Sequence, residues 1–164
     1  MTSTTSDRVA TVTPQGETTT VIERTFAAPL ALVWETMTRP EHVRQWYGCG
    51  NGTVTTCDID LRVGGRWHYV ITRTDGSGED SFSGEYLELD PPHLVVSTEG
   101  YDNMPGAVYT VRLTLEERDG KTYLRNELSY AAREVRDGHL AAGMEIGLNA
   151  SYDALERIAN GLAG

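Results

Sequence analysis

Six side chains of the sequence have the chemistry of metal ligands, namely His42, Cys49, Cys57, His68, His93 and His139. Zinc sites usually draw their ligands from closely spaced pairs of cysteine or histidine, and none of these residues forms such a pair. We therefore expect no metal centre. A serine nucleophile is not indicated either, because the Gly-x-Ser-x-Gly motif does not occur in the sequence.

Acid–base chemistry could use several ionisable side chains, and the candidates are His68, Glu85, Arg112, Glu127 and Glu145. The pattern does not show which of them point inward, and charged residues on strands are most often exposed to solvent. The only lysine, Lys121, adjoins an Asp-Gly turn, which disfavours a buried Schiff-base lysine. The sequence therefore predicts no particular catalytic residue.

Two glycine-rich segments raise the question of nucleotide binding. Residues 48–52, GCGNG, superficially look like a dinucleotide fingerprint, but that fingerprint lies between a strand and a following helix. Here a helix is expected before the segment and a strand after it, so no nucleotide cofactor is predicted. Gly64 and Gly65 are interpreted as a corner between two strands, because glycine adopts backbone angles that other residues reach poorly.

Aromatic residues are the most informative group. Strand alternation places Trp67 and Tyr69 on one face, which we expect to lie under a helix, and Arg66 and His68 on the other. Buried tyrosine and tryptophan usually need polar partners, so a pocket lined by them suits a flat, largely apolar molecule with a few polar atoms. The predicted pocket residues are Trp34, Trp67, Tyr69, Phe82, Tyr86, Tyr109, Met144, Leu148 and Tyr152.

The elements that must position these residues are indicated by hydrophobic periodicity. Residues 18–26 alternate as a strand. Two short helices are expected next: one contains apolar residues at helical spacing from Leu30 to Met37, and the other begins at Pro40. Further strands are expected at 53–59, 65–73, 81–89, 94–99, 109–117 and 121–130. Their short turns, such as Asp119-Gly120, allow only antiparallel pairing. An amphipathic stripe over 140–162, introduced by Asp137-Gly138, predicts a long C-terminal helix and hence an α+β fold.

The composition limits the partners and the domain organisation. The net charge of −10 disfavours nucleic acids and anionic membranes, and no apolar run is long enough to span a bilayer. Residues 1–17 are polar and rich in Ser and Thr, so we expect a disordered tail and no secretion signal, followed by a single domain over 18–164. With no disulfide framework, the expected location is the cytoplasm.

Several short motifs, taken in order, resemble one family. They are Arg24-x-Phe26-x-Ala-Pro29, Val33-Trp34, Pro40-Glu41 with Trp46, Asp60-Leu-Arg-Val-Gly-Gly-Arg-Trp67, Gly84-x-Tyr86-x-Glu88-x-Asp90-Pro-Pro92 and Gly143-Met144-x-x-Gly147. Over residues 20–162 the chain resembles the activator-of-heat-shock-protein-ATPase-homologue branch of the START-like (SRPBCC, helix-grip) superfamily. The resemblance implies a curved antiparallel sheet of about six to seven strands wrapped around the C-terminal helix. The family usually has Trp where this chain has Leu148, which either enlarges the pocket or leaves space that Tyr152 fills.

The resemblance also implies functions. The leading one is non-catalytic binding of a small hydrophobic or polycyclic metabolite by a monomer or weak homodimer. Alternatives are self-resistance to an enediyne, by sequestration or by sacrifice of the backbone at Gly100, Gly106, Gly143 or Gly147, and a polyketide aromatase/cyclase. Regulation of a chaperone ATPase is less favoured, because such co-chaperones carry an extra domain.

Overall fold

The computed structural model describes residues 9–48, 52–104, 108–141 and 144–163, with the side chains of 144–147 outside the description. Its strands are β1 (Thr11–Gln15), β2 (Thr19–Phe26), β3 (Gly52–Ile59), β4 (Arg66–Arg73), β5 (Glu79–Asp90), β6 (Leu94–Tyr101), β7 (Val108–Arg118) and β8 (Lys121–Ser129). They form one antiparallel sheet in the order β1-β2-β8-β7-β6-β5-β4-β3. Residues 49–51 of the GCGNG segment lie outside the described part, between a helix and a strand as expected.

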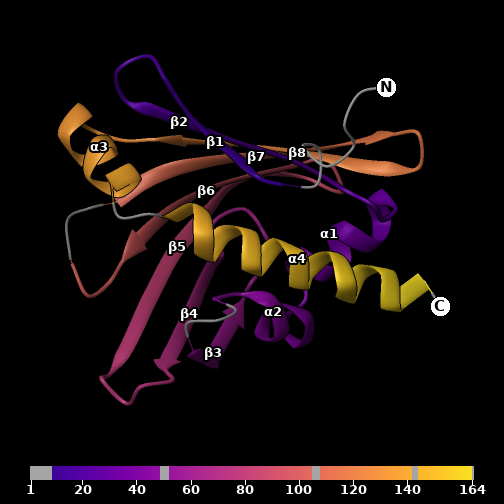
Figure 1. Cartoon of the computed structure of the whole chain (residues 1–164), viewed down its shortest axis with the longest axis horizontal. Helices are drawn as coiled ribbons and strands as arrows, with labels where there is room; N and C mark the ends of the chain where they lie inside the picture. The colour runs from indigo at the N-terminus through magenta and orange to yellow at the C-terminus, as the bar shows by residue number, and fades with distance from the viewer. Residues whose placement is uncertain (1–8, 49–51, 105–107, 142–143, 164) are drawn as a thin grey trace.

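Four helices are described alongside this sheet, namely α1 (Leu30–Thr38), α2 (Pro40–Trp46), α3 (Arg133–Ala141) and α4 (Met144–Ala163). The sheet curves around α4, and α1 and α2 lie beside the C-terminal part of that helix (Figure 1). The predicted α+β helix-grip architecture is therefore confirmed. No helix among the described residues is long and apolar enough to span a membrane.

The first strand corrects the prediction for the N-terminal segment. Residues 11–15 lie within the expected disordered tail 1–17, yet they pair with β2 from Thr11↔Glu23 to Gln15↔Thr19. The physical reason is that threonine and valine are β-branched, and Gly16 at φ 62° allows the tight turn into β2. This strand raises the number in the sheet to eight. Residues 1–8 of the predicted tail lie outside the described residues.

The helical region after β8 also differs from the prediction. Asp137-Gly138 was expected to introduce one long helix, but α3 runs through this pair and α4 is a separate helix. The guanidinium of Arg136 explains the position of α3. This buried side chain donates to the carbonyl oxygen of Thr19 at 2.7 Å and to that of Gly16 at 3.3 Å. Arg136 thus ties α3 to the β1–β2 hairpin.

Two turns behave as their sequence predicts. Asp119 and Gly120 have φ values of 53° and 78° and form the two-residue loop between β7 and β8, where Arg118 pairs with Lys121. Gly64, at φ 86°, turns the chain between β3 and β4. A Cβ on Gly65 would lie 2.1 Å from the carbonyl oxygen of Asp60, so only glycine fits that corner. These glycines are structural, as interpreted above.

The core lies between the sheet and α4. Ile22, Phe26, Leu124 and Leu128 from neighbouring strands are buried together with Leu155 and Ala159 of the helix. Val33 of α1 and Val43 of α2 close one end of it. The indole Nε1 of Trp46 donates to the carbonyl oxygen of Thr36 at 2.8 Å, which joins α2 to the last turn of α1.

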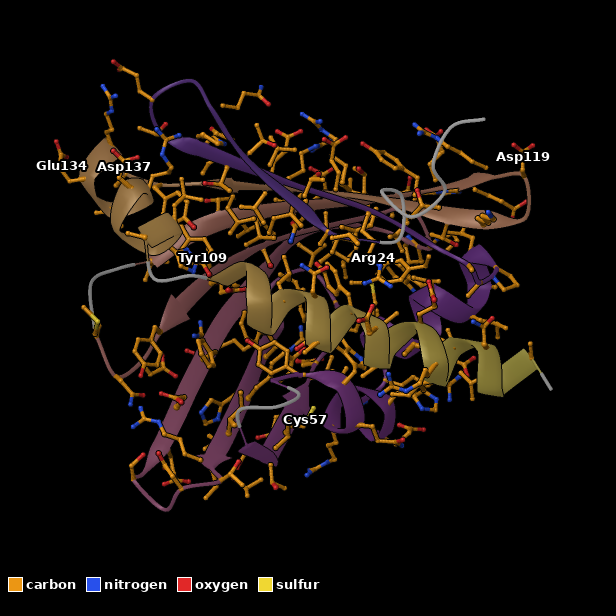
Figure 2. The ribbon with its side chains drawn as sticks, in the orientation of Figure 1. Arg24, Cys57, Tyr109, Asp119, Glu134 and Asp137 are labelled. Atoms are coloured by element: carbon orange, nitrogen blue, oxygen red, sulfur yellow. The ribbon has the colours of Figure 1, made fainter. Side chains whose placement is uncertain are left out.

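A buried arginine holds α4 against the sheet. Arg24 of β2 lies between the two layers (Figure 2), and its side chain is 1% exposed. Its Nη1 lies 2.8 Å from Asp153 Oδ1 and its Nη2 lies 3.5 Å from Glu156 Oε1. Glu156 Oε1 also accepts a hydrogen bond from the backbone N–H of Ala27 at 2.9 Å. This ion-pair cluster fixes the position of the helix relative to β2.

The two edges of the sheet are irregular. β1 forms one edge and contains Pro14, which has no backbone N–H. β3 forms the other edge, and its pairing with β4 shifts register between Val54 and Thr56.

Candidate ligand-binding cavity

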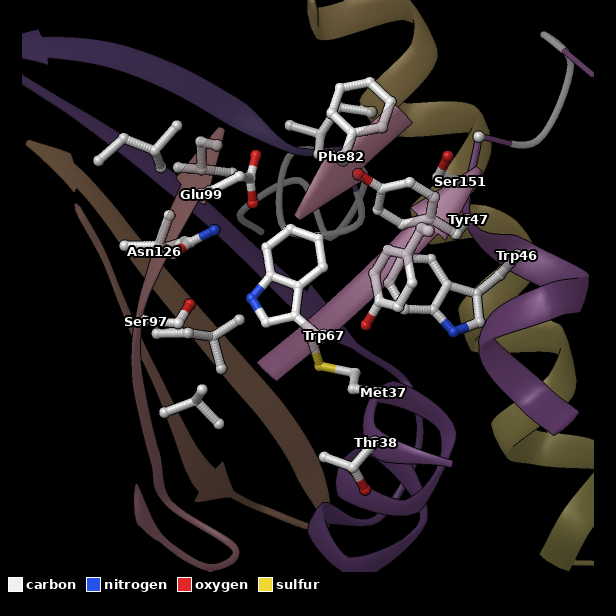
Figure 3. A pocket seen from close by; sticks show the side chains of 18 of the residues that line it. Met37, Thr38, Trp46, Tyr47, Trp67, Phe82, Ser97, Glu99, Asn126 and Ser151 are labelled. Carbon is white, nitrogen blue, oxygen red and sulfur yellow. The ribbon is translucent and has the colours of Figure 1, made fainter. Parts of the chain in front are cut away.

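A cavity of about 620 Å³ lies between the sheet and α4. Its lining includes eight of the predicted pocket residues, namely Trp34, Trp67, Tyr69, Phe82, Tyr86, Tyr109, Leu148 and Tyr152. The side chain of the ninth, Met144, lies outside the described residues. Met37 and Thr38 of α1 lie at one end of the cavity, and Phe82 and Glu99 lie at the other (Figure 3). The structure thus brings these residues together, while ligand binding by them stays a prediction.

One wall of the cavity is aromatic. The ring of Tyr47, which follows α2, lies edge-on to Tyr69 with centroids 4.7 Å apart, and 5.9 Å from Phe82. Trp67 lies 4.8 Å from Tyr69 on the same face of β4. Trp46 also lines the cavity, so all three tryptophans of the chain do so. A continuous aromatic surface of this kind favours flat, apolar molecules.

The opposite wall carries polar groups among valine and leucine side chains. Ser97 and Glu99 of β6 and Asn126 of β8 lie together across the cavity from Trp67 (Figure 3). The hydroxyl of Tyr109 donates a hydrogen bond to Glu99 Oε2, and the two residues are direct partners in the β6–β7 pairing. A flat molecule in this cavity would therefore contact rings on one side and hydrogen-bonding groups on the other.

Burial shifts the ionisable groups of the cavity toward their neutral forms. Loss of solvation raises the pKa of Glu99 above its usual value, and the hydrogen bond from Tyr109 opposes this shift. Burial also raises the pKa of Tyr47 and Tyr69, so both phenols stay protonated at neutral pH. His139 of α3 shares a hydrogen bond with the Tyr130 hydroxyl, and burial lowers the pKa of its imidazole. Among the described residues of the lining, the ionisable groups are therefore neutral phenols, one imidazole and the carboxyl group of Glu99.

The acid–base candidates from the sequence lie elsewhere. His68, Glu85, Arg112 and Glu127 are not among the cavity-lining residues, and the side chain of Glu145 lies outside the described part. On the outer face of the sheet, Arg66 lies 4.0 Å from Glu85, and on β8 Arg125 donates to Glu127 at 3.1 Å. These charges are paired at the surface rather than directed into the cavity.

Glu99, the one carboxylate among the described residues of the cavity lining, is not predicted by the sequence. A signal for it exists, because Val95, Ser97 and Glu99 share one face of β6 by strand alternation. Tyr109 is expected in the pocket, and Glu99 lies directly opposite it. Using that signal requires the register of β6 and β7, which the connecting residues 102–107 do not reveal. Tyr47 is not predicted either, because its place in the cavity depends on its contacts with Tyr69 and Phe82, and the sequence does not show them.

A serine, histidine and aspartate meet on the outer face of the sheet. Ser81 Oγ lies 2.9 Å from His68 Nε2 and donates to Asp102 Oδ2 at 2.6 Å. In a catalytic triad the histidine stands between the other two and takes the serine proton. Here the serine stands in the middle and its proton already points to the aspartate, so the serine is not activated as a nucleophile. Among the described residues, no group of histidine, cysteine and acidic side chains has metal-binding geometry.

Gly84 of β5 is the cross-strand partner of Trp67 and is closely packed. A Cβ there would lie 1.9 Å from the carbonyl oxygen of Thr98 and 2.6 Å from Trp67 Nε1. We expect Gly84→Ala to lower the free energy of unfolding by about 1–3 kcal/mol, measured by urea denaturation. Gly138→Ala is the control, because nothing lies within 4 Å of a Cβ at this helical position. A Gly84→Ala variant as stable as this control would contradict the packing described.

An open antiparallel sheet that curves around a C-terminal helix and encloses a cavity defines the helix-grip class of START-like proteins. Residues 27–160 match the family described as Activator of Hsp90 ATPase homolog 1-like protein, and the chain belongs to this family. The match confirms the family resemblance seen in the sequence motifs.

Solved structures support the same assignment. A Rhodobacter sphaeroides protein is 26% identical with a TM-score of 0.87, over 93% of this chain and 99% of that one. Protein Ms6760 of Mycobacterium smegmatis is 27% identical with a TM-score of 0.81, over 91% and 96% of the two chains. CalU16 of Micromonospora echinospora, at 23% identity and a TM-score of 0.60 over 93% and 88%, shows the fold alone. A comparison with curated proteins returns no match.

Proposed function

We propose that the protein binds a small hydrophobic or polycyclic metabolite in this cavity without transforming it. The observation that carries the proposal is the cavity itself, whose volume of about 620 Å³ is typical of ligand pockets. Its aromatic wall faces Ser97, Glu99 and Asn126, so one side offers ring contacts and the other offers a few hydrogen-bonding groups. No serine of the described lining is hydrogen-bonded to a histidine or a carboxylate, which favours binding over covalent catalysis.

A ligand screen tests the proposal directly. Polycyclic aromatic, poly-ketone and enediyne compounds are added to the protein, and thermal unfolding and tryptophan emission are recorded. Because all three tryptophans line the cavity, a bound compound should change their emission. A ligand at a hundredfold excess over its Kd stabilises the folded state by about 2.7 kcal/mol. If every compound leaves both signals unchanged, the proposal is wrong.

Leu148→Trp supplies the matched variant for this screen. Leu148 is on α4 and lines the cavity, so an indole at this position occupies volume that the ligand needs. We expect at least a tenfold loss of affinity for any compound that binds the unmodified protein. Leu162→Trp is the control, because Leu162 is on the same helix and is 37% exposed. Equal affinities in the two variants would show that the compound binds outside the cavity.

A further inference from the structure

We propose that the cavity selects a ligand carrying a protonated amine on a flat apolar ring system, with Glu99 as the anionic partner of the amine. This inference rests on the proposed function and deepens it by naming the chemical class of the ligand. It is carried by the isolation of the Glu99 carboxylate, by the aromatic surface opposite it and by the charge of the whole chain.

Glu99 is the only carboxylate among the described residues that line the cavity. Its side chain extends from β6 toward the space in front of Trp67 (Figure 3). The described structure gives it one hydrogen bond, from the Tyr109 hydroxyl, and no arginine or lysine within ion-pair distance. A partly buried carboxylate with one hydrogen bond and no counter-charge is poorly compensated, so a site of this kind gains most from a cation.

The other titratable groups around Glu99 do not supply that cation. They are Tyr47 after α2, Tyr69 of β4, Tyr109 of β7, Tyr130 after β8 and Tyr152 of α4, together with Tyr86 of β5 and His139 of α3, which line the same cavity; burial raises the pKa of Tyr86. Burial also raises the pKa of each of the other tyrosines, and the negative charge of Glu99 contributes to every one of these latter shifts. The tyrosines are therefore neutral hydrogen-bonding groups. His139, whose pKa burial lowers, is neutral at pH 7.

The aromatic wall is the second contribution. The faces of indole and phenol rings attract cations, and Trp67 and Tyr47 lie across the cavity from Glu99. An ammonium group between this wall and the carboxylate would have an anion on one side and ring faces on the other. The net charge of −10 adds a long-range attraction for cations and a repulsion for anionic ligands.

A matched pair of probes separates charge from shape. The compounds 9-(aminomethyl)anthracene and 9-ethylanthracene have the same ring system and nearly the same side-chain volume, but only the first is a cation at neutral pH. Binding is followed by tryptophan emission, which overlaps anthracene absorption. At pH 7.5 we expect the amine to bind at least tenfold more tightly than the hydrocarbon. In Glu99→Gln, a neutral variant of the same shape, the ratio of the two affinities should fall to about one.

The pH dependence provides a measurement that needs no variant. The pKa of Glu99 is raised above 4.5, so the carboxylate takes up a proton at a higher pH than an exposed glutamate. Affinity for the amine should therefore fall as the pH falls through that raised pKa, while affinity for 9-ethylanthracene stays flat. His139 also gains a proton on the acid side of neutrality. In His139→Gln the fall in amine affinity should persist, which assigns it to Glu99.

Every outcome of the probe experiment decides between the proposals. Equal affinity of the unmodified protein for the two probes overturns the amine proposal and leaves the binding function intact. Tighter binding of the hydrocarbon overturns it as well, since Glu99 would then act as a neutral carboxylic acid. If neither probe binds while Leu148→Trp abolishes binding of another compound, the amine proposal alone is wrong. If no compound binds at all, both are wrong.

Discussion

Replacing Arg24 with methionine is expected to lower the free energy of unfolding by about 3–5 kcal/mol. Methionine keeps much of the side-chain volume but removes the guanidinium that faces Asp153 and Glu156. The two carboxylates differ in their surroundings, because the Asp153 side chain is 58% exposed whereas that of Glu156 is 9% exposed. Water can solvate Asp153, but Glu156 would remain a buried carboxylate that has lost the Arg24 guanidinium, and that is the origin of the large loss.

Urea denaturation followed by circular dichroism measures this loss, and two further variants give it a mechanism. Asp153→Asn removes the exposed partner and should cost less than about 1 kcal/mol. In the double variant Arg24→Met with Glu156→Gln, the amide oxygen can still accept from the Ala27 N–H, and no buried charge remains. We expect this double variant to recover most of the stability. If Arg24→Met alone proves as stable as Asp153→Asn, the ion-pair cluster does not hold the helix.

Replacing Trp46 with alanine should also cost about 3–5 kcal/mol. The indole is buried in the core, and its removal leaves a cavity between α2, α4 and β3. It also removes the donor to the carbonyl oxygen of Thr36, which belongs to the last turn of α1 and lacks a partner within its own helix. The two short helices are adjacent, with only Arg39 between them, so this hydrogen bond fixes the angle at which they meet.

Trp46→Phe separates the two contributions. Phenylalanine keeps most of the apolar contact but cannot donate to Thr36, so the expected loss of stability is about 1–3 kcal/mol. Thermal and urea unfolding of the two variants give the comparison. A phenylalanine variant as stable as the unmodified protein would show that water replaces the indole N–H at Thr36. An alanine variant that loses under 1 kcal/mol would contradict the buried role of Trp46.

The strands β2 to β8 were predictable because their residues alternate and clear turn signals separate most of them. Asp119-Gly120 is the clearest case, since both residues adopt positive φ in the two-residue loop and so fix the β7–β8 register. The same alternation puts Trp67 and Tyr69 on one face of β4, and both side chains line the cavity. These features depend on neighbours in the sequence, and local patterns are sufficient to reveal them.

The features that the sequence did not reveal depend on contacts between different elements of the fold. β1 lies in the segment 1–17 that its polar composition predicts to be disordered, and its pairing with β2 orders it. The helical region begins before the expected start at Asp137-Gly138, and Arg136 ties this first helix, α3, to the β1–β2 hairpin. Glu99 looks like an ordinary strand charge until the register with Tyr109 is known. In each case the deciding contact is made with another element of the fold, and the pattern of the segment itself does not specify that contact.

Leu148 stands where the family usually has tryptophan, and the structure shows what surrounds this position. The sequence left two possibilities, a larger pocket or a space filled by Tyr152. The ring of Tyr152 packs edge-on against Phe26 of β2, with centroids 5.4 Å apart, and Leu148 borders the cavity that remains. Leu148→Trp, proposed above as the blocking variant, therefore places an indole where the family usually has one.

The irregular edges of the sheet bear on how the protein behaves at high concentration. An open sheet exposes unpaired backbone groups along its outer strands, and these can recruit strands from other molecules into aggregates. At one edge Pro14 removes a backbone donor from β1, and at the other the register shift between Val54 and Thr56 breaks the straight run of β3. Both features disfavour the addition of a strand from another molecule. The protein can therefore stay unaggregated in spite of its open sheet, and its cavity remains accessible to a ligand.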